Sequence, residues 1–106
     1  MLYEIKRDEK EVNGIGVETW KREITHCNIL EIEAGTTGFQ GGDTGHGGRT
    51  YLRLKDLGST DIEVNVVKDN YGCTEVTIEL GGDAELETFI EALEFAVKVL
   101  KEQSKE

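Results

Sequence analysis

The change of hydrophobic period within residues 74–100, TEVTIELGGDAELETFIEALEFAVKVL, decides the fold class of this chain. Up to Leu80 the apolar side chains alternate with polar ones, which is typical of a half-buried strand. After Gly81 and Gly82 they recur every three or four residues, which indicates an amphipathic helix. We expect this helix to cover residues 83–103, with Asp83 as its N-cap.

Alternating segments also precede this point, and they predict further strands over residues 1–6, 15–25, 27–34, 49–56 and 61–68, besides the one over 74–80. Residues 7–14 are highly charged and end in Asn13-Gly14, a strong hairpin signal, so we expect a turn there. The predicted fold class is α+β in a single domain of residues 1–106. It consists of an antiparallel meander of five to six strands and one long C-terminal helix, which covers the inward faces of the last three strands.

The helix carries two sets of apolar side chains. The main stripe should face the sheet, and it consists of Leu86, Phe89, Ile90, Leu93, Ala96, Val97 and Leu100. A second flank consists of Ala92, Phe95 and Val99. It either widens the stripe on the chain's own sheet or contacts a helix of another subunit in a homo-oligomer.

Composition excludes several classes of function. The net charge of −10 over 106 residues argues against a binder of nucleic acid polymers or of an anionic membrane surface. A small anionic ligand remains compatible, because local arginines can outweigh a diffuse negative field at contact distance. No stretch approaches the roughly 20 apolar residues of a membrane span, and the N-terminus does not resemble a signal peptide. We therefore expect a cytoplasmic protein, in which both cysteines are reduced.

Residues 35–48, GTTGFQGGDTGHGG, include seven glycines. Glycines let backbone amides approach a ligand closely and form an anion-binding nest. The run is not a Walker loop, because Asp43 stands in place of the first glycine, and arginine in place of lysine. It is either a flexible or purely structural loop, or a ligand loop. Its polar residues favour the second interpretation, in which Phe39, Gly41, Gly42, Thr44 and His46 contact the ligand.

Two strand faces combine arginine with an aromatic residue. Arg49, Tyr51 and Arg53 fall on one side of the strand after the glycine run, and Trp20 and Arg22 form a similar pair on an earlier strand. Arginine binds phosphate bidentately and an aromatic ring stacks on a base, so these five residues are candidates for binding a nucleotide. The alternative is that both faces are solvated and that the arginines form salt bridges with the many glutamates.

The residue types for catalysis exist, but their spacing does not select them. Cys27 or Cys73 could pair with His46, with Asp43 orienting the ring. His26, His46 and Asp43 could hold a metal, but at no recognised spacing. We therefore expect no catalytic site, no metal and no cofactor.

Residues 33–54, EAGTTGFQGGDTGHGGRTYLRL, and 80–100, LGGDAELETFIEALEFAVKVL, resemble the Thoeris anti-defence family of small phage proteins. Members of that family sequester cyclic ADP-ribose signals made by bacterial TIR-domain proteins, and some are associated with cyclic oligonucleotides. The resemblance implies a non-enzymatic homo-oligomer in the host cytoplasm, with nucleotide pockets near its subunit contacts. The alternative function is an acidic protein–protein interaction or inhibitor module, which would present its −10 charge to a basic partner.

Overall fold

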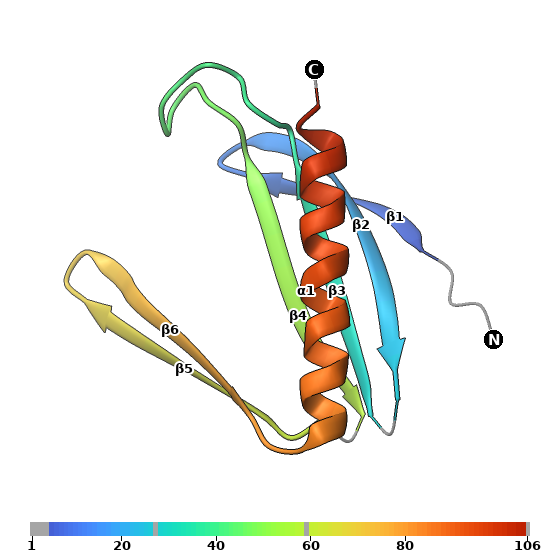
Figure 1. Cartoon of the computed structure of the whole chain (residues 1–106). Coiled ribbons are helices and arrows are strands. Elements are labelled where there is room, and N and C mark those ends of the chain that lie inside the picture. The colour runs from blue at the N-terminus through green and yellow to red at the C-terminus, as the bar shows by residue number, and fades with distance from the viewer. Residues whose placement is uncertain (1–4, 27, 59, 106) are drawn as a thin grey trace.

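The computed structural model describes residues 5–26, 28–58 and 60–105. It contains six antiparallel strands and one C-terminal helix, so the predicted α+β class is confirmed (Figure 1). In chain order the elements are β1 (Lys6–Val12), β2 (Ile15–Thr25), β3 (Ile29–Thr36), β4 (Thr50–Gly58), β5 (Ile62–Asp69), β6 (Gly72–Leu80) and α1 (Asp83–Gln103). The described residues contain no helix that is both long enough and apolar enough to cross a membrane.

The strands divide into a four-stranded sheet, in the order β1-β2-β3-β4, and a separate β5–β6 hairpin. The hairpin turns away because hydrogen bonds fix the segment that leads into it. The Thr60 amide donates to Asp56 Oδ1 at 3.3 Å, and Thr60 Oγ1 donates to the Ile29 carbonyl at 3.3 Å. Figure 1 shows that the hairpin and α1 diverge from a common end of the molecule.

The β1–β2 hairpin corrects one sequence prediction. Asn13 and Gly14 form the expected turn, with φ of 50° and 81°, which is the left-handed conformation that a tight two-residue turn requires. Most of the predicted charged turn over residues 7–14 is, however, strand β1, and residues 1–4 of the predicted first strand lie outside the described residues. The charges fit a strand because β2 supplies partners: Arg7 pairs with Glu18 at 2.7 Å, and Lys21 with Asp8 at 3.3 Å.

Helix α1 packs on β3 and, to a lesser extent, on β2. The prediction that it covers the last three strands is therefore wrong, and the predicted main stripe faces the core only in part: Ala96 is buried there and Phe89 packs against it. The second flank of Ala92, Phe95 and Val99 lies in the chain's own core instead of an oligomer interface. Most of the predicted main stripe is 41–58% exposed, namely Leu86, Ile90, Leu93 and Val97. The core contributed by the sheet consists of Ile24, Leu30, Ile32 and Ala34.

Polar contacts fix both halves of α1 on the sheet. Asp83 is the first helical residue and not the N-cap, since Gly82 occupies that position without a side-chain capping bond. The Thr88 hydroxyl donates to Asn28 Oδ1 at 2.8 Å, and both side chains are buried. At the other end, Gln103 accepts from the Thr36 amide and donates to the Glu18 carbonyl, both at 2.9 Å. These bonds set the helix in register with β2 and β3.

Candidate functional site

The glycine-rich loop between β3 and β4 is held by its own hydrogen bonds. The Thr37 amide donates to the Arg49 carbonyl at 2.9 Å, which closes the base of the loop. The Arg49 guanidinium donates to the carbonyls of Gly47 and Gly45, each at 2.9 Å, and the residue is buried. Arg49 therefore organises the loop from within, and two of its donors are already used.

The loop also contains its own anion. Asp43 Oδ1 accepts from the amides of Gly45 at 2.9 Å and His46 at 3.2 Å, and it lies 3.1 Å from His46 Nδ1. The Gly45 amide first, and then the His46 ring and amide, lower the pKa of Asp43 below its ordinary value. This carboxylate thus occupies the amide nest that the sequence suggested for a phosphate.

Close packing within the loop explains several of its glycines. A Cβ on Gly42 would lie 2.7 Å from the carbonyl carbon of His46, and one on Gly47 would lie 2.5 Å from the Gly42 carbonyl oxygen. A Cβ on Gly48 would overlap the carbonyl oxygen of Gly38. Two backbone segments pass each other at distances that no other residue allows. These glycines have a structural role whether or not the loop binds a ligand.

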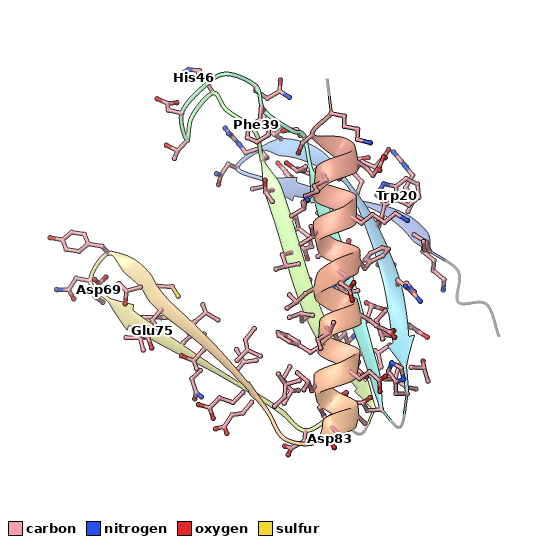
Figure 2. All side chains as sticks on the ribbon, in the orientation of Figure 1. Trp20, Phe39, His46, Asp69, Glu75 and Asp83 are labelled. Carbon is pink, nitrogen blue, oxygen red and sulfur yellow. The ribbon has the colours of Figure 1, made fainter. Side chains whose placement is uncertain are left out.

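A cavity of about 500 Å³ lies between this loop and the end of α1. It brings together three of the predicted residues, Phe39, Gly41 and Gly42, with Leu100 and Ser104 of the helix. Phe39 is 84% exposed, and Thr44 and His46 are exposed in the loop without lining this cavity (Figure 2). The described lining of this cavity contains no cationic side chain, so the cavity does not favour an anion.

Arg53 lies on the sheet face opposite α1, where its guanidinium donates hydrogen bonds to two glutamates. It donates to Glu33 Oε1 from Nε at 3.1 Å and from Nη2 at 2.9 Å, and it also donates to Glu31. Glu33 is fully buried and accepts from Thr19 Oγ1 at 2.6 Å. Burial alone would raise the pKa of Glu33, but the bonds from Thr19 and Arg53 and the charges of Lys10 and Arg53 hold it below its ordinary value.

Tyr51 lies two residues from Arg53 and points to the same face of β4. The sequence-predicted residues therefore divide among three places: the loop, this far face, and the face of β2 that looks toward α1. The structure does not bring them into one site. For Arg53, the alternative that the arginines form salt bridges with glutamates is correct.

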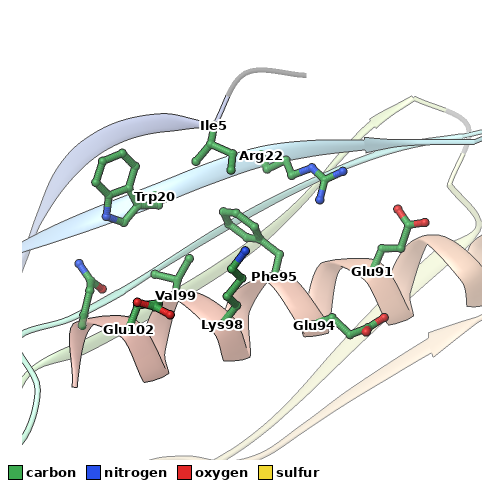
Figure 3. Close-up of a pocket in the computed structure, with 10 residues that line it drawn as sticks. Ile5, Trp20, Arg22, Glu91, Glu94, Phe95, Lys98, Val99 and Glu102 are labelled. Atoms are coloured by element: carbon green, nitrogen blue, oxygen red, sulfur yellow. The ribbon is translucent and has the colours of Figure 1, made fainter. Parts of the chain in front are cut away.

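The remaining pair, Trp20 and Arg22, lines a cavity of about 690 Å³ between β2 and α1 (Figure 3). Residues on the same side of β2 are spaced by two, which places this pair in line with the core residue Ile24. We call this cavity the β2–α1 pocket; its lining is completed by Ile5, Glu91, Glu94, Phe95, Lys98, Val99, Glu102 and Gln103.

The β2–α1 pocket combines an aromatic, apolar wall with unpaired cations. Trp20 packs against the core cluster that contains Phe95 and Val99, which gives the apolar part. In Figure 3, Arg22 extends from β2 and Lys98 from α1 toward the space beside Phe95. Neither cation forms an ion pair within the described part of the chain. Of the three glutamates in the lining, Glu91 contacts His26 at 3.2 Å.

Sequence reasoning missed the helix side of this pocket. Glu91, Glu94, Lys98 and Glu102 recur at spacings of three and four, and Phe95 belongs to the same side of the helix. Their mixture of charged and apolar side chains was a usable signal. It was not recognised because the wrong face of α1 was assigned to the core.

Among the described residues, the structure does not bring together Cys73 with His46, or His26 with His46 and Asp43. Cys73 lies in β6, in the hairpin that Figure 2 shows apart from His46, and Cys27 lies outside the described residues. His46 contacts Asp43 while both side chains are largely exposed. Over residues 5–26, 28–58 and 60–105, no group of three or more His, Cys, Asp or Glu is arranged to hold a metal ion.

The unpaired arginine and lysine beside a tryptophan make the β2–α1 pocket the best candidate site in the described chain. Comparisons of the sequence with protein families and curated proteins, and of the fold with solved structures, find no match.

Proposed function

We propose that this protein binds and sequesters a small phosphorylated nucleotide in the β2–α1 pocket. The observation that carries the proposal is the lining of one cavity by Trp20, Arg22 and Lys98. Its volume of about 690 Å³ lies in the range of small-molecule sites, roughly 300–1,000 Å³. An aromatic wall with a few polar groups is the usual composition of such sites.

Each lining residue has a chemical role in this proposal. The Trp20 ring stacks on the base, an interaction that tolerates different bases because each has a π-face. Arg22 forms two parallel hydrogen bonds with a phosphate, and Lys98 adds a second positive charge. Glu94 and Glu102 accept hydrogen bonds from ribose hydroxyls or base amino groups. The lining has three glutamates against two cations, so the phosphate must be held by direct contact with Arg22 and Lys98, and the ligand must also offer hydrogen-bond donors to the carboxylates.

We propose that the pocket binds its ligand without turnover. Its described lining contains no cysteine, serine, threonine or histidine, and we assign Lys98 and the glutamates to ligand contacts. The resemblance to the Thoeris anti-defence family makes cyclic ADP-ribose isomers and cyclic oligonucleotides the first ligands to examine. Sequestration of such a signal in the host cytoplasm is the anti-defence role that we propose for this chain.

Titration calorimetry with cyclic ADP-ribose isomers, ADP-ribose and cyclic dinucleotides tests the proposal. At least one of them should bind, and chromatography after long incubation should recover it intact. Arg22→Ala and Lys98→Ala should each weaken binding about tenfold to hundredfold, because each removes a charged hydrogen-bond donor. Lys101→Ala is the matched control: it removes the same charge from the same helix at a residue that does not line the β2–α1 pocket.

Two results would contradict the proposal. One is the absence of heat with every ligand of the panel, which would favour the acidic interaction module instead. The other is a ligand that binds Arg22→Ala and the parent protein equally, which would move the site elsewhere.

A further inference from the structure

The β5–β6 hairpin carries an apolar face that no other element of the described chain covers. The register pairs Ile62 with Leu80, Val64 with Ile78, and Val66 with Val76, and alternation places all six side chains on one face. We call this the hairpin face. Val64, Val66 and Val76 are about half exposed, at 55%, 49% and 58%. The opposite face carries Glu63 directly across from Glu79.

An uncovered hairpin is not expected to be stable. An isolated two-stranded hairpin is at best marginally stable in water, and it gains stability by packing its apolar face on another element. Beyond their mutual pairing, β5 and β6 make no extensive contact with another described element. We therefore expect another apolar surface to pack on the hairpin face in the folded protein.

Helix α1 carries the second uncovered apolar surface. Leu86, Ile90, Leu93 and Val97 are spaced by three and four residues, so they form one row, which we call the helix stripe. The residues 86–97 span about 17 Å at 1.5 Å per residue. The three cross-strand pairs of the hairpin face, over residues 62–66, span about 13 Å. The two surfaces are similar in length, and both are apolar.

The hairpin does not lie on its own helix, and hydrogen bonds hold its base. The Gly81 amide donates to the Asp61 carbonyl at 3.2 Å, and the Asp61 amide donates to Glu85 Oε2 at 3.4 Å. Together with the bonds of Thr60 to β3 and β4, these contacts hold both strands where they leave the rest of the chain. In Figure 1 the hairpin and α1 separate progressively from this end.

We propose that two copies of this chain form a dimer in which the hairpin face of each copy packs on the helix stripe of the other. Such a pair is isologous, because a two-fold axis relates the hairpin-on-helix contact of one copy to the helix-on-hairpin contact of the other. The negative charge of the chain does not prevent it, since the hairpin carboxylates Glu63, Glu75 and Glu79 lie on the opposite face and stay in water.

The exposed area is sufficient for this contact. Eight large apolar side chains available to this contact are 41–58% exposed: three on the hairpin face, four on the helix stripe, and Leu52, which lies on the α1 side of β4. A half-exposed side chain of this type offers roughly 30–60 Å² of apolar surface, so the eight offer roughly 250–500 Å². At the usual apolar share of an interface this corresponds to roughly 400–800 Å² per copy, which overlaps the range of a standard protein interface.

Light scattering and sedimentation velocity test the dimer. The parent chain should have twice the 11.8 kDa mass of one copy and should dissociate on dilution. Val64→Asp and Ile90→Asp each place a carboxylate in both symmetric contacts, so each should weaken the dimer at least hundredfold. Asn65→Asp is the matched control, since it adds the same charge to the outer face of the same strand. Unchanged circular dichroism would show that the variants remain folded.

Mixing the two variants identifies the contact. In a mixed pair, one contact contains both aspartates, but the other joins the unaltered hairpin of the Ile90→Asp chain to the unaltered helix of the Val64→Asp chain. One carboxylate already opens a contact, so the second aspartate in the altered contact costs little more, and the mixed pair keeps one intact contact that neither variant alone has. An equimolar mixture should therefore associate more tightly than either variant alone. A hairpin-on-hairpin contact would not be restored by mixing, and that result would overturn the proposal.

Two further results would overturn it. One is the mass of a single copy at every protein concentration. If β5 and β6 of that monomer are also protected from hydrogen exchange, the hairpin closes on its own helix instead. The other is a dimer that survives both substitutions. The β2–α1 pocket lies on the opposite flank of α1 from the hairpin (Figure 2), so this test and the nucleotide test can fail independently.

Discussion

Two valines of α1, two residues apart, provide a sharp test of which helix face forms the core. Val99 is 8% exposed and packs in the core cluster, whereas Val97 is 49% exposed on the helix stripe. Val→Ala removes two methyl-sized groups. For a buried valine this costs about 1.5–2 kcal/mol of the free energy of unfolding, once lost transfer energy and the residual cavity are counted.

The gain in helix propensity from valine to alanine, about 0.5 kcal/mol, applies to both positions and cancels in the comparison. We therefore expect Val99→Ala to lower the free energy of unfolding by about 1 kcal/mol more than Val97→Ala does. Urea denaturation followed by circular dichroism measures both values, at two protein concentrations, because burial of Val97 against a second copy would make its cost concentration-dependent. An equal or larger cost for Val97→Ala in the dilute protein would refute the assignment of the core face.

Three further predictions concern the sheet and the loop. The Glu9 amide first, and then Lys10 and Lys21, lower the pKa of Asp8 from 3.8 to about 2. A carboxylate with a lowered folded pKa stabilises the fold above its unfolded pKa and loses this effect as the pH falls. The free energy of unfolding should therefore decrease between pH 3.8 and about 2, and Asp8→Asn should flatten that decrease in acid titrations followed by circular dichroism. Arg49→Ala should cost about 1–3 kcal/mol, since the Gly45 and Gly47 carbonyls lose their charged donor. Hydrogen exchange of residues 37–49 should accelerate in this variant, and unchanged exchange would contradict the role of Arg49. Gly48→Ala should destabilise the loop by about 1–3 kcal/mol because its Cβ meets the Gly38 carbonyl, whereas Gly45→Ala should cost less, as urea denaturation can measure.

Local patterns were sufficient for most of the elements. The Asn13-Gly14 pair predicted a turn that requires left-handed backbone, and the structure has it there. The change of period after Leu80 predicted a helix over residues 83–103, which are the observed bounds. The charged segment before Asn13 was assigned to a turn because strand pairing depends on partners elsewhere in the chain. Only the register with β2 shows that its charges are neutralised in pairs.

The orientation of α1 could not be obtained from periodicity alone. Both of its apolar faces have helical spacing, and the more hydrophobic one is exposed. The choice depends on the hairpin, which turns away and leaves β2 and β3 to receive the helix. Ala92 and Ala96 are small, so this face can approach the sheet closely. The packing of the sheet on the helix thus places the face with the small residues in the core and leaves the larger residues of the helix stripe exposed.

The candidate site was predicted in part for the same reason. Trp20 and Arg22 were identified because spacing by two puts them on one side of β2. Arg49 and Arg53 have the same residue type, but their acceptors, the loop carbonyls and two glutamates, are known only from the fold. Lys98 was missed because its place beside Arg22 depends on the orientation of α1.

Trp20 is the one tryptophan in the sequence, so intrinsic tryptophan emission reports on the β2–α1 pocket directly. Titration of the protein with cyclic ADP-ribose isomers and cyclic dinucleotides, followed by this emission, is the most direct test of the proposed site. We predict a saturable change in emission whose midpoint agrees with calorimetry and shifts at least tenfold in Arg22→Ala. A ligand that binds by calorimetry while Trp20 emission stays constant would contradict the proposed site.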